Sequence, residues 1–180
     1  MNAIFRSVSR SAAVAALCLV GAASAQEPAA SAVLDAAVTR ARTEHKNVLV
    51  HFGASWCTWC RHLDAMLEGP ELGALFDDHY VITHLTIMES ADSKALENPG
   101  ALEVAEAAAG PISGVPFFMF LDGEGQAIAT SIALPNGGNI GHPVTAEEIE
   151  AFIGLLEKTA PRMTPADRVR VANYLSSRKY

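Results

Sequence analysis

Two cysteines separated by only two residues, Cys57 and Cys60, constrain the fold of this chain most strongly. They stand between the apolar run 47–52, which reads as a buried strand, and the segment 57–68, whose apolar residues recur at helical spacing. Two thiols at such a strand-to-helix junction can close a small disulfide and reopen it, which is the chemistry of thiol–disulfide exchange. The same spacing also occurs in zinc sites, but a zinc site needs four ligands.

The first 25 residues have the layout of a secretory signal peptide. Two arginines open the segment, an apolar stretch follows at 12–21, and small residues at 23–25 form a cleavage site. The apolar stretch is too short to span a bilayer. We therefore expect cleavage after Ala25, loss of Cys18 with the signal, and a periplasmic or secreted mature protein.

The charges and cysteines that remain after this cleavage argue against several functions. The chain has 13 basic and 20 acidic residues, and loss of the two signal-peptide arginines leaves 11 basic residues and a formal net charge of −9. This balance argues against a nucleic-acid partner, and no later apolar segment is long enough for membrane insertion. Cys57 and Cys60 would be the only cysteines left, which leaves a zinc site incomplete and favours a working pair over the alternative of a structural disulfide.

The rest of the mature chain alternates between helical and strand patterns. Residues 26–32 form a lead that we expect to be loose, and one domain follows at 33–180. Helices are predicted at 33–44, 57–68, 71–77, 101–109, 145–157 and 164–178, and strands at 47–52, 80–87, 115–121 and 126–134, with a surface loop at 135–143. This order is typical of an α/β domain with both parallel and antiparallel strands.

Two segments resemble the thioredoxin superfamily. Residues 53–60, with the sequence G-A-S-W-C-T-W-C, resemble its active-site segment, and Gly114-Val115-Pro116-Phe117 resembles the segment that places a cis-proline beside that site. The resemblance covers residues 33–160 and implies a thioredoxin-like fold, with a central mixed β-sheet flanked by helices. Compared with a compact thioredoxin, the region around 89–110 is an insertion and the C-terminal helix at 164–178 is an addition.

Position on the helix gives the two cysteines different expected roles. Cys57, at the helix start, faces unpaired backbone N–H groups and the positive end of the helix dipole, which favour a thiolate, so we expect it to be the nucleophile. Cys60, one turn inward, is expected to be the shielded resolving thiol and the disulfide partner of Cys57. The resemblance implies an exported thiol–disulfide oxidoreductase that acts on protein thiols and disulfides. It would need no cofactor or metal, and a membrane or periplasmic redox partner would supply or remove its electrons.

Four residues are predicted to contact substrates: Trp56, Trp59, Val115 and Pro116. A cis bond before Pro116, which the resemblance implies, would expose the backbone of Val115 so that an extended substrate segment pairs with it. The alternative is an ordinary trans proline at the start of an edge strand. Trp59 would either offer an apolar surface to a partner or pack against the turn before the helix.

His51 departs from the family pattern, because thioredoxin carries a buried aspartate at this place in its central strand. An imidazole, with an ordinary pKa of about 6.5, could exchange a proton with Cys60; the alternative is a core histidine without a catalytic role. A different function also stays open, in which Cys57 and Cys60, with or without His51 or His62, hold Cu(I) in a metallochaperone or peptide-binding module. The direction of thiol exchange is not predicted, because the dipeptide Thr58-Trp59 differs from those of thioredoxin and protein disulfide isomerase.

Overall fold

The computed structural model describes residues 26–179, so the predicted signal peptide lies outside the described residues. The helices are α1 (Ala30–Glu44), α2 (Thr58–Leu67), α3 (Gly73–Asp77), the 3-10 helix η1 (Ala91–Leu96), α4 (Ala101–Ala109), α5 (Ala146–Thr159) and α6 (Pro165–Ser177). The strands are β1 (Asn47–Gly53), β2 (Tyr80–Thr86), β3 (Phe117–Leu121) and β4 (Ala127–Thr130). Within residues 26–179, no helix has the length and apolar character needed to cross a membrane.

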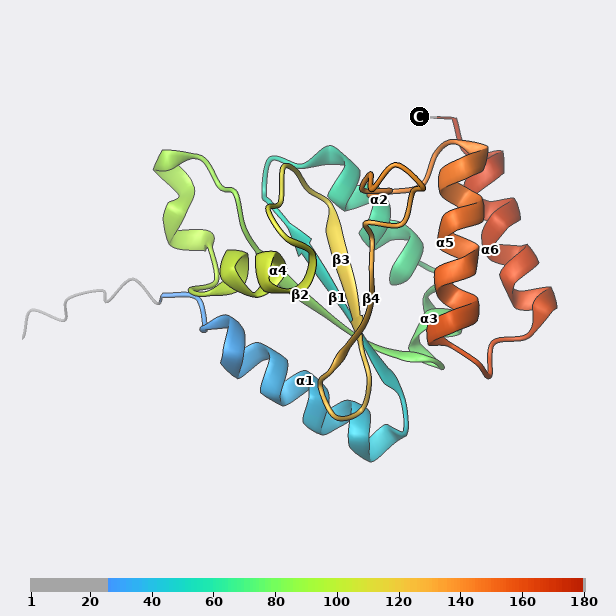
Figure 1. Cartoon of the computed structure of the whole chain (residues 1–180), viewed down its shortest axis with the longest axis horizontal. Helices are drawn as coiled ribbons and strands as arrows, with labels where there is room; N and C mark the ends of the chain where they lie inside the picture. Colours follow the sequence, from blue (N-terminus) through green and yellow to red (C-terminus); the bar gives the residue numbers. More distant parts are fainter. Residues whose placement is uncertain (1–25, 180) are drawn as a thin grey trace, which may run out of the picture.

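The four strands form one mixed sheet in the order β2-β1-β3-β4. Strand β1 pairs in parallel with β2 and antiparallel with β3, and β3 pairs antiparallel with β4. Figure 1 shows the sheet in the middle of the molecule, between α1 and α4 on one side and α5 and α6 on the other. The predicted architecture, a central mixed sheet flanked by helices, is confirmed.

Successive residues of β1 point to opposite faces of the sheet and enter two separate cores. Val48, Val50 and Phe52 belong to the core that contains residues of α1 and α4, whereas Leu49 packs with residues of α2, α3, α5 and α6. By this alternation His51 and Gly53 lie on the same face as Leu49. Both residues are therefore on the α2 side of the sheet, where the two cysteines lie.

Two capping boxes begin the C-terminal helices. The Thr145 side chain accepts a hydrogen bond from the N–H of Glu148, whose carboxylate accepts one from the N–H of Thr145 at 2.8 Å. Thr164 and Asp167 form the same pair at the start of α6. A capping box satisfies backbone N–H groups that have no partner inside the helix, which is why both helices begin where the sequence predicts.

Two strands are shorter than predicted. Strand β3 begins at Phe117 rather than at 115, since Pro116 has no N–H to donate to a sheet ladder. Strand β4 ends at Thr130 rather than at 134. The N–H of Ser131 still donates to the carbonyl of Phe118 at 2.8 Å, but the N–H of Phe118 donates to the side-chain oxygen of Ser131 at 3.0 Å, so the regular backbone ladder is interrupted at Ser131.

The expectation of a loose lead at 26–32 is wrong for its second half. Helix α1 begins at Ala30, which is only 1% exposed and whose N–H donates to the carbonyl of Pro99 at 2.9 Å. The side chain of Asn98 also donates to the carbonyl of Pro28 at 2.9 Å. The lead is held because the distant region around 89–110 packs against it, and a local sequence pattern cannot reveal such a partner.

Candidate active site

Cys57 and Cys60 are joined by a disulfide in this structure, with their Cα atoms 5.3 Å apart. Cys57 is the N-cap of α2, and its sulfur accepts a hydrogen bond from the N–H of Cys60 at 3.0 Å. Cys60 is 4% exposed, so it is shielded as expected, and Cys57 is equally buried in the disulfide form at 3%. Position on the helix distinguishes the two sulfurs, because only Cys57 stands at the end where unpaired N–H groups favour a thiolate.

The turn before Cys57 is held by the segment that follows β2. Glu89 is only 5% exposed, and its carboxylate accepts hydrogen bonds from both the backbone N–H and the hydroxyl of Ser55. The indole N–H of Trp56 donates to the carbonyl of Met88 at 2.8 Å, although Trp56 is 56% exposed. These contacts fix the backbone of Ser55 and Trp56 and so position Cys57 at the start of α2.

Trp59 contacts the loop at 135–143. Its ring is stacked on that of His142, with centroids 5.9 Å apart and planes 24° apart, and it lies 5.5 Å from the ring of His62. Burial, with a smaller contribution from His62, lowers the pKa of His142 to about 4. His142 is therefore a neutral, buried imidazole at pH 7, and it supports a tryptophan that remains 43% exposed.

A groove of about 390 Å³ lies beside Trp59 and is lined by residues of the 113–116 segment, the 139–145 loop and Glu148. The peptide bond between Val115 and Pro116 is cis, as the resemblance implied. The Asn139 side chain donates to the carbonyl of Pro116 at 2.9 Å and thereby joins the two walls of the groove. Trp59, Val115 and Pro116 thus line one groove, whereas Trp56 lies outside its lining.

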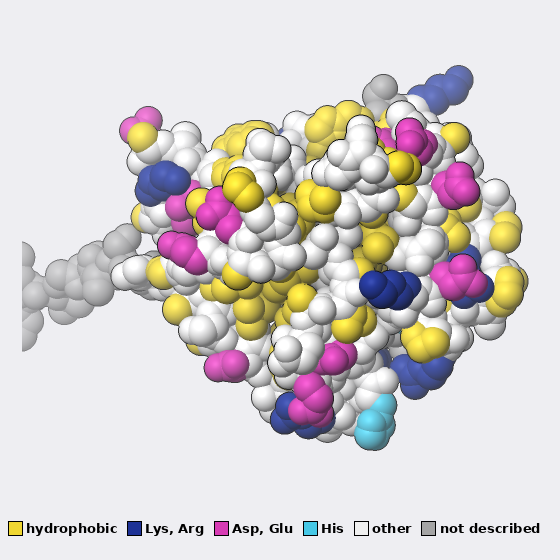
Figure 2. Space-filling model, viewed as in Figure 1, with side chains coloured by type: hydrophobic (Ala, Val, Ile, Leu, Met, Phe, Trp, Pro, Cys, Tyr) yellow, Lys and Arg dark blue, Asp and Glu magenta, His cyan; other side chains and the backbone are white. Residues whose placement is uncertain are grey.

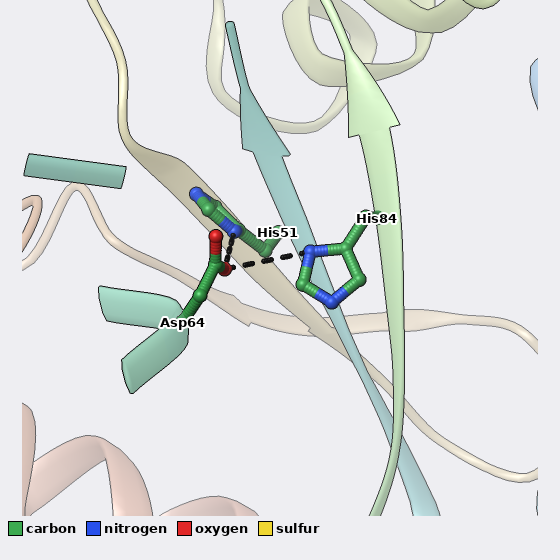
Figure 3. Close-up of side chains that lie close together, drawn as sticks. All are labelled: His51, Asp64 and His84. Carbon is green, nitrogen blue, oxygen red and sulfur yellow. Dashed lines mark hydrogen bonds and ion pairs between the residues drawn. The ribbon is translucent and has the colours of Figure 1, made fainter. Parts of the chain in front are cut away.

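His51 is 2% exposed, and its two ring nitrogens have different surroundings. Nδ1 lies 2.7 Å from Oδ1 of Asp64 on α2. His84, the register partner of His51 on β2, places its own Nδ1 3.5 Å from the same oxygen, and Figure 3 shows both imidazoles directed toward this carboxylate. Nε2 of His51 is buried and has no hydrogen-bond partner within residues 26–179.

Asp64, His51 and His84 also form a group that could hold a metal ion, because one ligand atom from each lies within 4.8 Å of the others. The sequence did not predict this group, since its members come from three different elements. His51 Nδ1 and Asp64 Oδ1 already satisfy one another at hydrogen-bond distance. His51 and Asp64 therefore satisfy each other by a direct hydrogen bond that needs no metal ion between them.

Comparison with known protein families identifies the class of protein that this fold and cysteine pair define. A family model described as thioredoxin-like matches residues 29–123, which is more than half of the chain. The chain belongs to the thioredoxin-like family. Among curated proteins, none matches it.

Solved structures with similar folds include a disulphide isomerase from Xylella fastidiosa Temecula1, at 20% identity and a TM-score of 0.48, over 90% of this chain and 96% of that chain. Thioredoxin O2 from Arabidopsis thaliana, in the oxidised state, matches at 22% identity and a TM-score of 0.40, over 72% of this chain and 88% of that one. A DsbH oxidoreductase matches at 16% identity and a TM-score of 0.38, over 84% and 95% of the two chains.

Sequence reasoning missed three residues of the candidate site: Asp64, Glu89 and His142. Asp64 sits on the exposed side of an amphipathic helix pattern, where an acidic residue is ordinary. Glu89 follows a strand without any motif, and His142 lies in a loop whose position could not be predicted. The contacts of these residues with His51, Ser55 and Trp59 join elements that are distant in sequence, so no local pattern predicts them.

Proposed function

We propose that this chain is an exported thiol–disulfide oxidoreductase that exchanges disulfides with protein substrates through Cys57 and Cys60. The observation that carries the proposal is the disulfide across the first turn of α2, with Cys57 as the N-cap of that helix. The family provides the general class of chemistry, and the helix start provides the asymmetry that divides the work between the two sulfurs.

The exchange proceeds in two steps that conserve electrons. A substrate thiolate attacks the sulfur of Cys57, the Cys57–Cys60 bond breaks, and its electron pair leaves with Cys60 as a thiolate. A second substrate thiolate then attacks the substrate sulfur of the mixed disulfide and releases Cys57 as a thiolate stabilised by the helix start. In the opposite direction, Cys57 attacks a substrate disulfide and Cys60 resolves the mixed disulfide.

Cys60 must gain or lose a proton in this cycle, and we assign that exchange to His51. The imidazole is buried on the face of β1 that is directed toward α2 and the cysteines. Its Nε2 is the ring nitrogen without a hydrogen-bond partner within residues 26–179. No metal or organic cofactor takes part in these sulfur displacements. The catalytic set is therefore Cys57, Cys60 and His51.

An extended substrate segment would bind in the groove beside Trp59, against the backbone of Val115 and the ring of Pro116. Trp56 and Trp59 are both strongly exposed, and they would present an apolar surface next to the cysteines. On the face shown in Figure 2, basic side chains are dispersed among acidic ones and form no basic stripe of the kind that binds nucleic acid.

Export rests on the signal-peptide pattern at 1–25, and an exported enzyme would exchange electrons with a membrane or periplasmic redox partner. The prediction is tested by expressing the full-length chain in a bacterium with two membranes and measuring the intact mass of the protein recovered from the periplasm. A mature chain that begins at Gln26 is expected. A full-length chain confined to the cytoplasm would contradict export without affecting the assignment of the thiols.

The activity is tested with an unfolded model protein that contains two cysteines. One molecule of the enzyme with the Cys57–Cys60 disulfide should oxidise one pair of thiols in the reduced model protein, and its own disulfide should be reduced in the same ratio. Cys57→Ser should abolish the transfer. The Cys57 thiolate of reduced Cys60→Ser should attack the disulfide of oxidised model protein and remain joined to it as a mixed disulfide, with the second substrate cysteine released as a thiolate. Transfer by both single variants at the wild-type rate would contradict the proposal.

A further inference from the structure

The hydrogen bond between His51 and Asp64 determines which ring nitrogen of His51 can accept a proton. A neutral imidazole has one N–H and one acceptor nitrogen, and an ionised carboxylate only accepts. With Asp64 Oδ1 2.7 Å from Nδ1, the N–H belongs on Nδ1. Nε2, buried and without a hydrogen-bond partner within residues 26–179, is then the acceptor.

Gly53 shows where this acceptor nitrogen lies. A Cβ atom added to Gly53 would lie 3.3 Å from Nε2 of His51 and also 3.3 Å from Sγ of Cys60. The two atoms therefore border the same small space, and a glycine at the end of β1 leaves it free of side chain. Proton transfer between a thiol and an imidazole needs such a direct approach or one bridging water.

We propose that Asp64 is a positioning residue that holds His51 with Nε2 toward Cys60, so that Cys60, His51 and Asp64 form a proton relay across the space left by Gly53. The proposal rests on the function proposed above and adds Asp64 and Gly53 to it. During resolution, the proton of the Cys60 thiol passes to Nε2, the resulting thiolate attacks Cys57, and the substrate sulfur leaves with the electron pair of the broken bond. Asp64 stabilises the imidazolium until its proton leaves.

The groups around His51 are compatible with this role. Its register partner on β3 is Phe118, which carries no titratable group, and on β2 it is His84. His84 is more exposed than His51 and lies 3.0 Å from Glu68, one helical turn beyond Asp64. A hollow of about 390 Å³ is lined by His51, Cys60, Asp64 and His84, together with the charged residues Glu27, Arg61 and Glu89. This hollow gives the proton a route to solvent.

The relay is tested by separating the two half-reactions in stopped-flow experiments on Asp64→Ala, with Asp64→Glu as the conservative variant. We expect Asp64→Ala to slow resolution by Cys60 by about 10- to 100-fold, at or below the lower end of the range for general acid–base catalysis because His51 itself is kept, and to change attack by Cys57 by less than about twofold. Asp64→Glu should recover part of the loss. Glu68→Ala is a matched control, because it removes the carboxylate of the C-cap residue of α2, which also contacts a sheet histidine, and it should resolve at the wild-type rate.

Two further measurements distinguish positioning from a loss of stability. Nitrogen NMR of the neutral His51 imidazole should report the proton on Nδ1 in the wild type. In Asp64→Ala it should report a mixture of the Nδ1-protonated and Nε2-protonated tautomers. The pH profile of resolution should change in Asp64→Ala and not in Glu68→Ala. A folded Asp64→Ala variant with the wild-type resolution rate, pH profile and protonated nitrogen would overturn the role of Asp64.

Gly53→Ala tests the space between the two atoms without changing any charge. The added methyl group should slow resolution while the proton on Nδ1 of His51 stays in place. Unchanged resolution in Gly53→Ala would overturn transfer across this space. Failure of the wild-type protein to form any mixed disulfide would instead contradict the proposed function itself, so the two failures are distinguishable.

Discussion

Glu89 accepts two hydrogen bonds from Ser55, one from its backbone N–H and one from its hydroxyl at 2.8 Å. Ser55 lies two residues before Cys57, and Glu89 begins the region around 89–110 that the sequence distinguishes from a compact thioredoxin. These hydrogen bonds give the region around 89–110 a structural role. It holds the turn from which the cysteine helix starts.

Glu89→Ala should therefore lower the free energy of unfolding by about 1–3 kcal/mol, since a buried acceptor with two hydrogen-bond donors is removed. Ser55→Ala removes only the hydroxyl donor and keeps the backbone N–H, so its loss should be clearly smaller. Urea unfolding of the disulfide forms measures both changes. Equal losses in the two variants would mean that the backbone hydrogen bond contributes nothing.

Alkylation of the reduced protein should modify Cys57 faster than Cys60, because only Cys57 stands at the N-terminus of α2. The rate at Cys57 should rise with pH through a midpoint below that of a free thiol, which is about 8.5. Mass spectrometry of peptides after short exposures to iodoacetamide measures both rates. Equal rates would remove the basis for naming Cys57 the nucleophile.

The lowered pKa of His142 predicts that the free energy of unfolding falls at low pH. Burial lowers its pKa to about 4 in the folded protein, compared with an ordinary value of 6.5. The unfolded chain therefore binds the proton more readily, so the contribution of neutral His142 is complete above about pH 6.5 and is lost as the pH falls toward 4. The free energy of unfolding should fall less steeply over this window in His142→Gln than in the wild type.

Some slope should remain in His142→Gln, because burial also lowers the pKa of His79. Urea unfolding at several values between pH 7 and pH 4 gives the two slopes. Identical slopes in the wild type and the variant would show that His142 does not resist protonation in the folded protein.

The metal-binding alternative and thiol exchange predict different responses to metal ions. Dialysis against EDTA should leave the exchange rate unchanged, because each step displaces one sulfur by another. Titration of the reduced protein with Cu(I) in the presence of a competing chelator measures the affinity of the cysteine pair. Tight binding of one Cu(I) per chain, together with failure to form mixed disulfides, would favour the metallochaperone over the oxidoreductase.

Local signals in the sequence predicted the parts of the molecule that depend on neighbouring residues. The helix starts at Cys57, Thr145 and Thr164 and the four strands all follow from patterns a few residues long. The cis bond before Pro116 followed from the resemblance, since no local pattern distinguishes it from a trans bond. These features place the cysteine pair and one wall of the groove.

The sequence could not predict contacts between distant elements. Asp64 meets His51 only because α2 packs across β1, and Glu89 reaches Ser55 only because the chain turns back after β2. The lead before α1 is held by Asn98 through the same kind of contact. None of these residues has a local signature, because a single acidic or amide residue in a sequence is equally compatible with a solvated surface.

The most direct test of the central claim uses oxidised glutathione and the reduced forms of the wild type, Cys57→Ser and Cys60→Ser, with intact masses measured over time. Exchange through Cys57 with resolution by Cys60 predicts that Cys60→Ser accumulates one glutathione on Cys57. The wild type should close its internal disulfide and release two molecules of reduced glutathione, and Cys57→Ser should react slowly. Adduct formation on Cys57→Ser as fast as on Cys60→Ser, or a wild-type adduct that never resolves, would contradict this division of roles.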